Sequence, residues 1–446
     1  MSRLTARSRE LLLLVFATGL LLLMLFGLET SQGRTLSTEM LYIVGGFIGV
    51  YAIAHVAIAF LAPHADQVML PTVALLNAVG LVVIYRIDLA ERPGYGPLAE
   101  RQMLWSLVGV GLMVLTLIVV REHQALSRYS YLLGLLGLIL LALPLVWPQP
   151  EGTDARIWLW LGPFSIQPGE FSKILLLIFF AQLLAQKRAL FTVAGRRFLG
   201  FTFPRLRDLA PILMVWAIAI LIMAVSNDFG PALLLFATVL GMVYFATGRA
   251  SWLAIGLALV AIGGYAVYQV SSKIQERVAN FIDPFSDFEG IGNQPANALI
   301  SLSWGGVTGT GLGYGHPELV PVAHSDYILA AIGEELGFVG IAAVLSLFAV
   351  FITRGFRTAM QVRDTYGKLL ASGLALTLAI QIFVVAGGVS SMLPMTGLTT
   401  PFMSAGGSSV MANYILLGLL LRISNSANRP PEYDEATQRR EVVGAR

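Results

Sequence analysis

The chain has 446 residues, of which 56% are hydrophobic and 12% charged, and its formal net charge at pH 7 is +3. Soluble globular proteins carry about 25% charged residues, so this composition excludes a chain folded around one core in water. The absence of cysteine excludes disulfide bonds and thiolate metal sites, and the small charge excludes a basic nucleic-acid-binding domain. The composition instead predicts a protein surrounded largely by lipid.

Apolar segments that are long enough, or nearly so, to cross a bilayer recur along the chain, since one crossing takes about 20 helical residues. In chain order they cover residues 11–28, 40–62, 68–86, 102–121, 129–148, 169–186, 209–225, 229–247, 250–271, 326–353, 365–391 and 405–423. The first segment could be a signal peptide, but no small-residue cleavage site follows it and another apolar segment begins at Met40. We therefore predict an all-α, polytopic transmembrane bundle of about twelve helices, with the first helix retained.

Basic residues indicate the orientation of this bundle. With the N-terminus inside, most of the 29 Lys and Arg residues fall on cytoplasmic loops, as the positive-inside rule requires. Because a shift by one helix would reverse this asymmetry, we expect both termini to be cytoplasmic. In this topology residues 273–325 form one long outer loop, and the polar residues 425–446 form a disordered cytoplasmic tail.

Five polar stretches fall on the outer face in this topology. They are the segment around Arg156, the sequence IQPGEFSK (166–173), the sequence SNDFGP (226–231), the end of the long loop at Asp326, and the sequence PFMSAGGSS (401–409). Separate stretches that converge on one face are typical of a binding or catalytic site. We therefore expect the chemistry of the protein at this surface.

Five longer motifs, in this order, carry a resemblance to a known family. They are ARIWLWLGPFSIQPGEFSK (155–173), NDFGPALLL (227–235), WGGVTGTGLGYG (304–315), PVAHSDYILAAIGEELGFVG (321–340) and PMTGLTTPFMSAGGSS (394–409). Residues 70–424 thereby resemble the SEDS family, the shape, elongation, division and sporulation proteins of the RodA, FtsW and SpoVE types. The resemblance implies a ten-helix core over residues 68–424, and it makes residues 1–67 a two-helix N-terminal addition of the kind seen in actinobacterial RodA-like members.

The resemblance also implies a function. It predicts an inverting peptidoglycan glycosyltransferase in the bacterial cytoplasmic membrane, which polymerises lipid II into glycan strands on the outer face. The N-terminal pair of helices and the short tail favour a role in elongation and cell shape over one in division. The family further implies a class B penicillin-binding protein as partner, and nucleic acid is not expected to bind.

Two alternatives remain open at this point. Polar residues in or near apolar segments, such as Asn77, Glu334 and Gln381, would suit a transporter or lipid flippase, although no inverted repeat is evident. A non-catalytic scaffold for the penicillin-binding protein is the third possibility.

Asp326 matches the proposed catalytic aspartate of the family. A glycosyl transfer of this kind needs a base for the attacking hydroxyl, and a carboxylate in a membrane-embedded cleft can supply it. The alternative is a helix N-cap, for which Asp is favoured, and the helix dipole would then make it a weaker base. Burial would have the opposite effect on its pKa.

Seven further residues are candidates for substrate binding. Glu170 and Lys173 lie three residues apart, close to one turn of a helix, so they either form a local ion pair or orient the pyrophosphate of a substrate. Arg156 is a second candidate for phosphate, although Ile157 stands where many relatives have another arginine. Trp158 is either an interfacial anchor or a platform for a sugar.

The remaining three candidates are Asp228, His324 and Ser325. Asp228 either satisfies backbone donors in a tight turn or contacts substrate or metal. His324 and Ser325 directly precede Asp326 in the shared motif, and the resemblance assigns them to substrate binding. No cofactor is required by the sequence, and the one considered is a divalent cation, Mg²⁺ or Mn²⁺, beside the leaving pyrophosphate.

Overall fold

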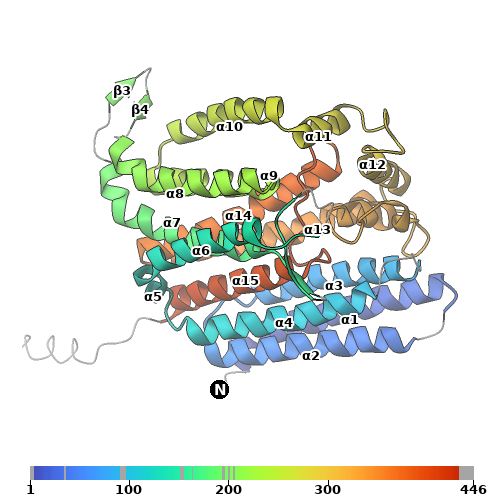
Figure 1. The fold of residues 1–446 in the computed structure, drawn as a ribbon. Helices are drawn as coiled ribbons and strands as arrows, with labels where there is room; N and C mark the ends of the chain where they lie inside the picture. The colour runs from blue at the N-terminus through green and yellow to red at the C-terminus, as the bar shows by residue number, and fades with distance from the viewer. Residues whose placement is uncertain are drawn as a thin grey trace, which may run out of the picture.

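The computed structural model describes residues 5–34, 37–90, 97–150, 155–162, 164–192, 196–198, 201–203 and 206–430. All twelve predicted helices are present there and run roughly parallel (Figure 1). They are α1 (Ser8–Ser31), α2 (Thr38–Leu61), α3 (Met69–Asp88), α4 (Leu98–Val119), α6 (Ser130–Val146), α7 (Pro168–Thr192), α8 (Leu206–Val225), α9 (Phe229–Thr247), α10 (Ser251–Val270), α13 (Ile328–Gln361), α14 (Thr365–Val389) and α15 (Gly407–Asn428). Ten helices in the described part are long and apolar enough to cross a membrane, and α6 and residues 213–225 of α8 are shorter apolar helices. The predicted transmembrane bundle is confirmed.

Several short elements lie between these helices and were not predicted. They are the 3₁₀ turns η1 (Thr5–Arg7) and η2 (Pro317–Leu319), the helices α5 (His123–Arg128), α11 (Ser272–Ile282) and α12 (Asn293–Gly305), and the strands β1 (Leu159–Leu161), β2 (Phe164–Ile166), β3 (Arg196–Phe198) and β4 (Phe201–Phe203). The strands form two antiparallel hairpins, β1 with β2 and β3 with β4. The long loop predicted over residues 273–325 therefore contains two helices and a 3₁₀ turn.

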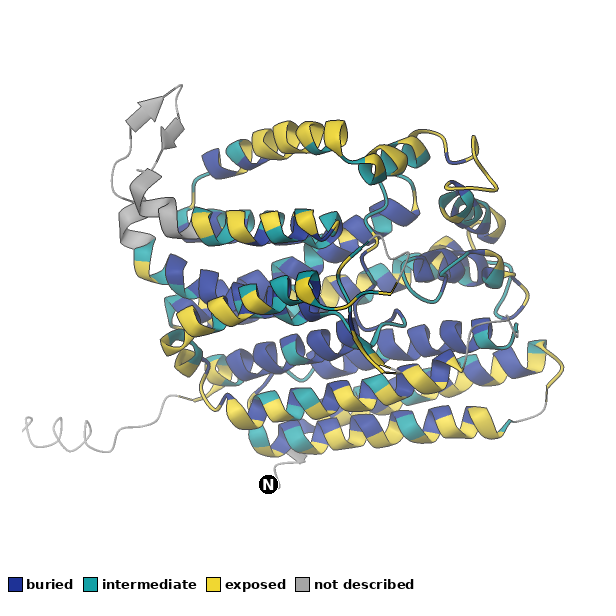
Figure 2. Ribbon diagram, in the orientation of Figure 1, coloured by how far each residue is buried: buried dark blue, intermediate teal, exposed yellow. Residues whose placement is uncertain are grey.

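The helices are apolar on all sides because both their protein neighbours and the surrounding lipid are apolar. In α1, Leu14 and Leu21 are buried, whereas Leu12 and Leu23 are more than 60% exposed. Helices α3 and α15 are buried along most of their length and form the centre of the bundle (Figure 2). The exposed leucines are thus the surface that lipid would cover.

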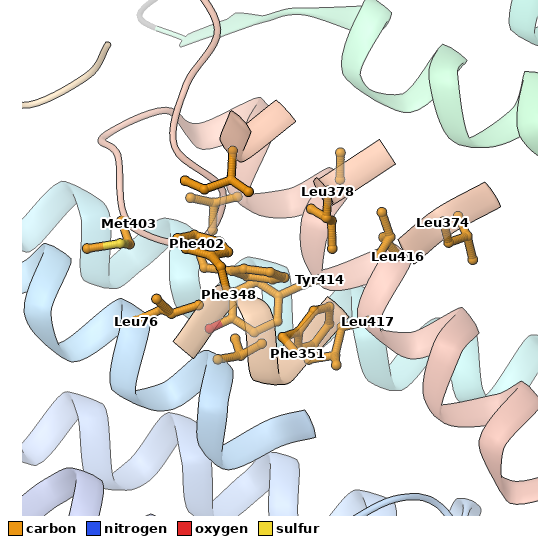
Figure 3. Close-up of a cluster of buried hydrophobic side chains, with 14 of the residues drawn as sticks. Leu76, Phe348, Phe351, Leu374, Leu378, Phe402, Met403, Tyr414, Leu416 and Leu417 are labelled. Carbon is orange, nitrogen blue, oxygen red and sulfur yellow. The ribbon is translucent and has the colours of Figure 1, made fainter. Parts of the chain in front are cut away.

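An aromatic cluster beside α15 supports the loop that precedes it (Figure 3). The ring of Phe402, in this loop, packs edge-to-face against Phe351 of α13 and Tyr414 of α15, with 5.8 Å between ring centroids in both pairs. Gly80 of α3 permits a close approach here, because a Cβ at that position would lie 2.6 Å from the carbonyl oxygen of Met403. The loop is therefore held in place by its contacts with α3, α13 and α15 in the core.

Both described ends of the chain lie at one end of the bundle, which the predicted cytoplasmic placement of both termini requires. The side chain of Asn428 donates a hydrogen bond to the carbonyl of His64, and that of Gln67 donates one to Ala6. We call this the terminal end, and we call the opposite end, which carries α11 and α12, the site end (Figure 1). Helix α15 runs to Asn428, past the predicted start of the tail, and residues 431–446 of that tail lie outside the described residues.

Candidate functional site

The segment that carries Asp326 is held by the loop before α15. Ser404 Oγ donates a hydrogen bond of 2.6 Å to the carbonyl of Ser325, and the backbone N–H of Ala405 donates one of 2.7 Å to the carbonyl of His324. Two of the five predicted stretches are thus joined directly. The aromatic cluster around Phe402 supports the same loop, so the backbone at Asp326 is fixed from the core outward.

The other three stretches join the same region. The backbone N–H of Gln167 donates to Ser408 Oγ at 2.8 Å, and that of Arg156 donates to the carbonyl of Ser226 at 3.2 Å. These bonds join the IQPGEFSK stretch to the loop before α15 and the Arg156 segment to the SNDFGP turn, and Asp228 of that turn lies within reach of the charge of Glu170. The five stretches that the topology assigned to one face therefore lie together at the site end.

Asp326 lies in the turn directly before α13, half-buried against a cavity of about 150 Å³. The capping residue of α13 is Tyr327, with no side-chain cap, so the structure does not support the N-cap alternative for Asp326. Ser325 Oγ donates a hydrogen bond of 2.8 Å to Asp326 Oδ1. Burial raises the pKa of Asp326 above its ordinary value, although Ser325 and Arg277 act against this rise. A raised pKa makes the carboxylate a stronger base.

Arg277, on α11, is a site residue that the sequence analysis missed. It lines the same cavity as Asp326, and its Nη1 donates a hydrogen bond of 3.2 Å to the carbonyl of Thr396. Burial lowers the pKa of Arg277, while the charges of Asp228 and Asp326 oppose this change. The available signal was the helical spacing of the apolar residues in SKIQERVANFI (272–282), Ile274, Val278, Phe281 and Ile282, with polar residues between them, which is typical of an amphipathic helix rather than of an irregular loop.

Glu170 and Lys173 form a buried ion pair between the first two turns of α7, with 2.8 Å between Oε2 and Nζ. Lys173 Nζ also lies 3.4 Å from Gln381 Oε1 of α14, and Gln381 Nε2 donates to the carbonyl of Thr399. The pair predicted from the spacing is therefore present, and it is linked to the loop that leads towards α15.

Asp228 lies at the N-terminus of α9, and its side chain makes no capping hydrogen bond there. Burial, followed by the charge of Glu170, raises the pKa of Asp228 to about 6, and Lys273, Arg277 and Lys173 limit that rise. The structure therefore gives no support to the simple turn role. It places Asp228 among charged groups of α7 and α11.

The same segment, residues 324–326, borders a second and larger cavity, of about 620 Å³. Its lining includes Trp105, Trp158, Phe164 and His324, so His324 and Asp326 line different cavities. Burial lowers the pKa of His324, which favours the neutral ring. Arg156 is exposed and lines neither of these two cavities, although its backbone belongs to the assembly.

The residues at the site end do not offer a protein cage for a metal ion. Within the described ranges, no group of three His, Cys, Asp or Glu side chains is placed to hold one. The carboxylates of Asp228, Asp326 and Glu170 are instead interspersed with the cations of Arg277 and Lys173. A divalent ion at this site would take its ligands mainly from a bound phosphate.

Comparisons with known proteins bear on this assembly. Residues 66–429 match the model of the FtsW, RodA and SpoVE family, described as cell cycle proteins. The peptidoglycan glycosyltransferase RodA of Mycobacterium tuberculosis is 48% identical, over 96% of this chain and 92% of its own. A probable peptidoglycan glycosyltransferase FtsW of Trichlorobacter lovleyi is 34% identical, over 82% of this chain and 94% of its own.

The fold is also similar to that of a solved structure. A chain of a peptidoglycan synthase complex, studied for its coordination of polymerization and crosslinking, matches with a TM-score of 0.65 and 27% identity. The match covers 82% of this chain and 99% of that chain. This protein is a multi-pass membrane protein of the FtsW, RodA and SpoVE family, which is the family that the sequence motifs indicated. Its resemblance is stronger to the RodA relative than to the FtsW relative.

Proposed function

We infer that this protein is a peptidoglycan glycosyltransferase of the RodA type, and that it polymerises lipid II at the outer face of the bacterial cytoplasmic membrane. The observation that carries the mechanism is the half-buried carboxylate of Asp326, with a raised pKa, in a cavity shared with Arg277. A base and a cation in one cavity match the two needs of glycosyl transfer from a pyrophosphate.

In the proposed reaction, Asp326 accepts the proton of the acceptor sugar's 4-hydroxyl. The resulting oxygen nucleophile forms a bond to the anomeric carbon of the donor, on the face opposite the leaving group. The bond between that carbon and the pyrophosphate oxygen breaks, and its electron pair leaves with the undecaprenyl pyrophosphate. Because one displacement occurs, the configuration at the anomeric carbon inverts.

Charge on the departing pyrophosphate is balanced by cations of this chain. Arg277 is placed for this task beside Asp326, and Lys173 is the second candidate because its ammonium is buried close to the same group of charges. Glu170 then orients Lys173 through their ion pair. A Mg²⁺ or Mn²⁺ ion, if required, would enter bound to the phosphates of the substrate.

The second cavity is suited to a sugar of the other lipid-linked substrate. Trp105 and Trp158 contribute aromatic side chains to its lining, and His324 contributes an imidazole whose lowered pKa favours the neutral ring. Ser325 acts on Asp326 through its hydrogen bond rather than on substrate directly. Arg156 is exposed outside both cavities, and its role would be to meet the phosphates of the substrate as it arrives.

The partner and the cellular role are proposals of the same kind. A class B penicillin-binding protein would crosslink the strands, in line with the structural match to a chain of a synthase complex. The higher identity to RodA than to FtsW relatives supports elongation over division. Capture of the bound penicillin-binding protein from cells tests both, and a division-specific partner would overturn the elongation role.

The experiment that tests the function uses purified protein and its partner with lipid II. We expect glycan strands to form in detergent, where no second leaflet exists. Movement of lipid II across a bilayer without any polymer would instead support the flippase alternative. A normal rate of polymerisation by the partner alone would support the scaffold alternative.

A further inference from the structure

Helices α1 and α2 are not part of the machinery common to the family. The family match begins at residue 66, and the matched synthase chain covers 82% of this protein. The match to the mycobacterial RodA covers 96% of this protein. The uncovered 4% is shorter than either helix, so the mycobacterial RodA has both α1 and α2. The pair is therefore a feature of one branch, and the reaction proposed above gives it no task.

The pair is anchored firmly at the terminal end of the bundle. Arg7 is fully buried, forms an ion pair with Glu10, and donates a hydrogen bond of 2.9 Å to the carbonyl of Ala65. Glu10 Oε1 lies 2.6 Å from Nδ1 of His55 on α2. These contacts tie the start of α1 to α2 and to the turn before α3.

At the opposite end, the last turn of α1 contacts the glycine-rich part of the outer loop. Gln32 Nε2, just after α1, donates a hydrogen bond to the carbonyl of Gly313. Gly313 has a φ of +85°, and a Cβ there would collide with Ser31 Oγ and lie 3.1 Å from a methyl group of Leu28. The loop backbone is thus pressed directly onto α1.

The next residues of the loop are held by α3 and α13. Arg86 Nη2 of α3 donates a hydrogen bond of 2.7 Å to the carbonyl of Gly315, and its Nε lies 3.0 Å from Glu335 Oε1 of α13. From this point the chain passes through η2 and reaches Asp326. The Gly313 turn is therefore the start of the segment that ends at the proposed base.

We propose that the outer end of α1 is a positioning element for Asp326. Gln32 and Ser31 hold the α1 side of the Gly313 turn, and α13 holds its other side through the hydrogen bond from the Gly311 N–H to the carbonyl of Glu335. The two contacts together set where the segment that carries the carboxylate begins. This inference rests on the proposed function, because Asp326 must be the base. Gln32 lines neither the Asp326 cavity nor the second cavity, so its loss leaves the KM for lipid II unchanged. Its loss lowers kcat, because the carboxylate of Asp326 is then held less well in place.

Two variants and a matched control test this role. Gln32→Ala removes the side chain, and Gln32→Glu keeps its size but cannot donate the hydrogen bond. Thr30→Ala is the control, because exposed Thr30 lies in the last turn of α1 and its side chain donates a hydrogen bond within its own helix, to the carbonyl of Phe26. We expect kcat to fall about three- to tenfold in both Gln32 variants, as for a lost hydrogen bond, with the control unchanged.

A spin label reports on the loop independently of activity. The chain has no cysteine, so His316→Cys, at a position with a 71% exposed side chain, gives one labelling site just beyond Gly315. We expect the label to become more mobile in both Gln32 variants and not in Thr30→Ala.

Unchanged kcat and unchanged mobility in both Gln32 variants would overturn the inference. The proposed function would still stand in that case, provided that the wild-type protein polymerises lipid II and Asp326→Asn does not. A wild-type protein without polymerase activity would overturn the proposed function instead.

Discussion

Arg277 and Asp326 face the same point beside Gly397. A Cβ at residue 397 would lie 3.5 Å from Arg277 Nη2 and 3.6 Å from Asp326 Oδ2. Gly397 has a φ of +74°, so its own backbone also favours glycine. The glycine therefore keeps open the space between the proposed base and the cation that would balance the leaving group.

The first prediction concerns this space. Gly397→Ala places a methyl group between the two charged groups, and we expect polymerisation to fall at least tenfold. Gly248→Ala is the matched control, since Gly248 has a φ of +69° and no neighbour within 4 Å of a Cβ. Both variants carry a backbone strain of about 1–2 kcal/mol, so only the site effect separates them. Equal activity of the two variants would show that the space is not used.

The second prediction concerns the pH dependence of kcat. Arg277 lowers the pKa of Asp326, so Arg277→Gln raises it further. Because Asp326 must be deprotonated to act as a base, we expect the acidic limb of the profile to move to higher pH and the plateau to fall. Arg277→Lys keeps a positive charge, so its acidic limb should lie between those of the wild-type protein and Arg277→Gln. An acidic limb in the same place for all three proteins would remove Arg277 from the mechanism.

The third prediction concerns the buried pair of Glu170 and Lys173. Removing one partner leaves an uncompensated buried charge, at a cost of about 3–5 kcal/mol, so Glu170→Gln and Lys173→Met should both lower the thermal unfolding temperature. The double variant should recover most of this stability, because neither charge remains. Its polymerisation rate should stay low if Lys173 contacts pyrophosphate, and a double variant with wild-type activity would make the pair purely structural.

The fourth prediction concerns Asp228. Its pKa is raised to about 6 in the folded protein, so the folded state binds more protons than the unfolded state between about pH 4 and pH 6. The free energy of unfolding therefore decreases as pH rises through this window, and the penalty is complete above it. We expect Asp228→Asn to stabilise the protein by about 1 kcal/mol near pH 7.5 and by nothing near pH 4. Unfolding temperatures at the two pH values measure this, and a uniform change at both would contradict it.

The twelve apolar helices could be predicted from the sequence because ten of them are apolar segments of bilayer length and the other two, α6 and α8, are only somewhat shorter, which is a property of each segment alone. The spacing of Glu170 and Lys173 likewise fixes their contact, since both lie on one turn. The β1–β2 hairpin could not be predicted, because strands of three residues depend on the tertiary structure around them. A segment of three residues is too short to show the alternation of apolar and polar residues that indicates a strand.

Arg277 was missed for a related reason. It lies far from Asp326 in the chain, on a helix within a segment read as a loop, and only the packing of α11 brings the two together. The contact of Gln32 with Gly313 is equally remote in sequence. In both cases, residue type and spacing carry no information about the partner.

The central claim is that Asp326 is the base, and the rate of lipid II polymerisation by Asp326→Asn tests it most directly. The asparagine variant keeps the volume of the side chain and can still accept the hydrogen bond of Ser325, so we expect it to fold, to bind its partner and to lose at least a thousandfold in rate. Polymerisation by this variant at the wild-type rate would contradict the mechanism.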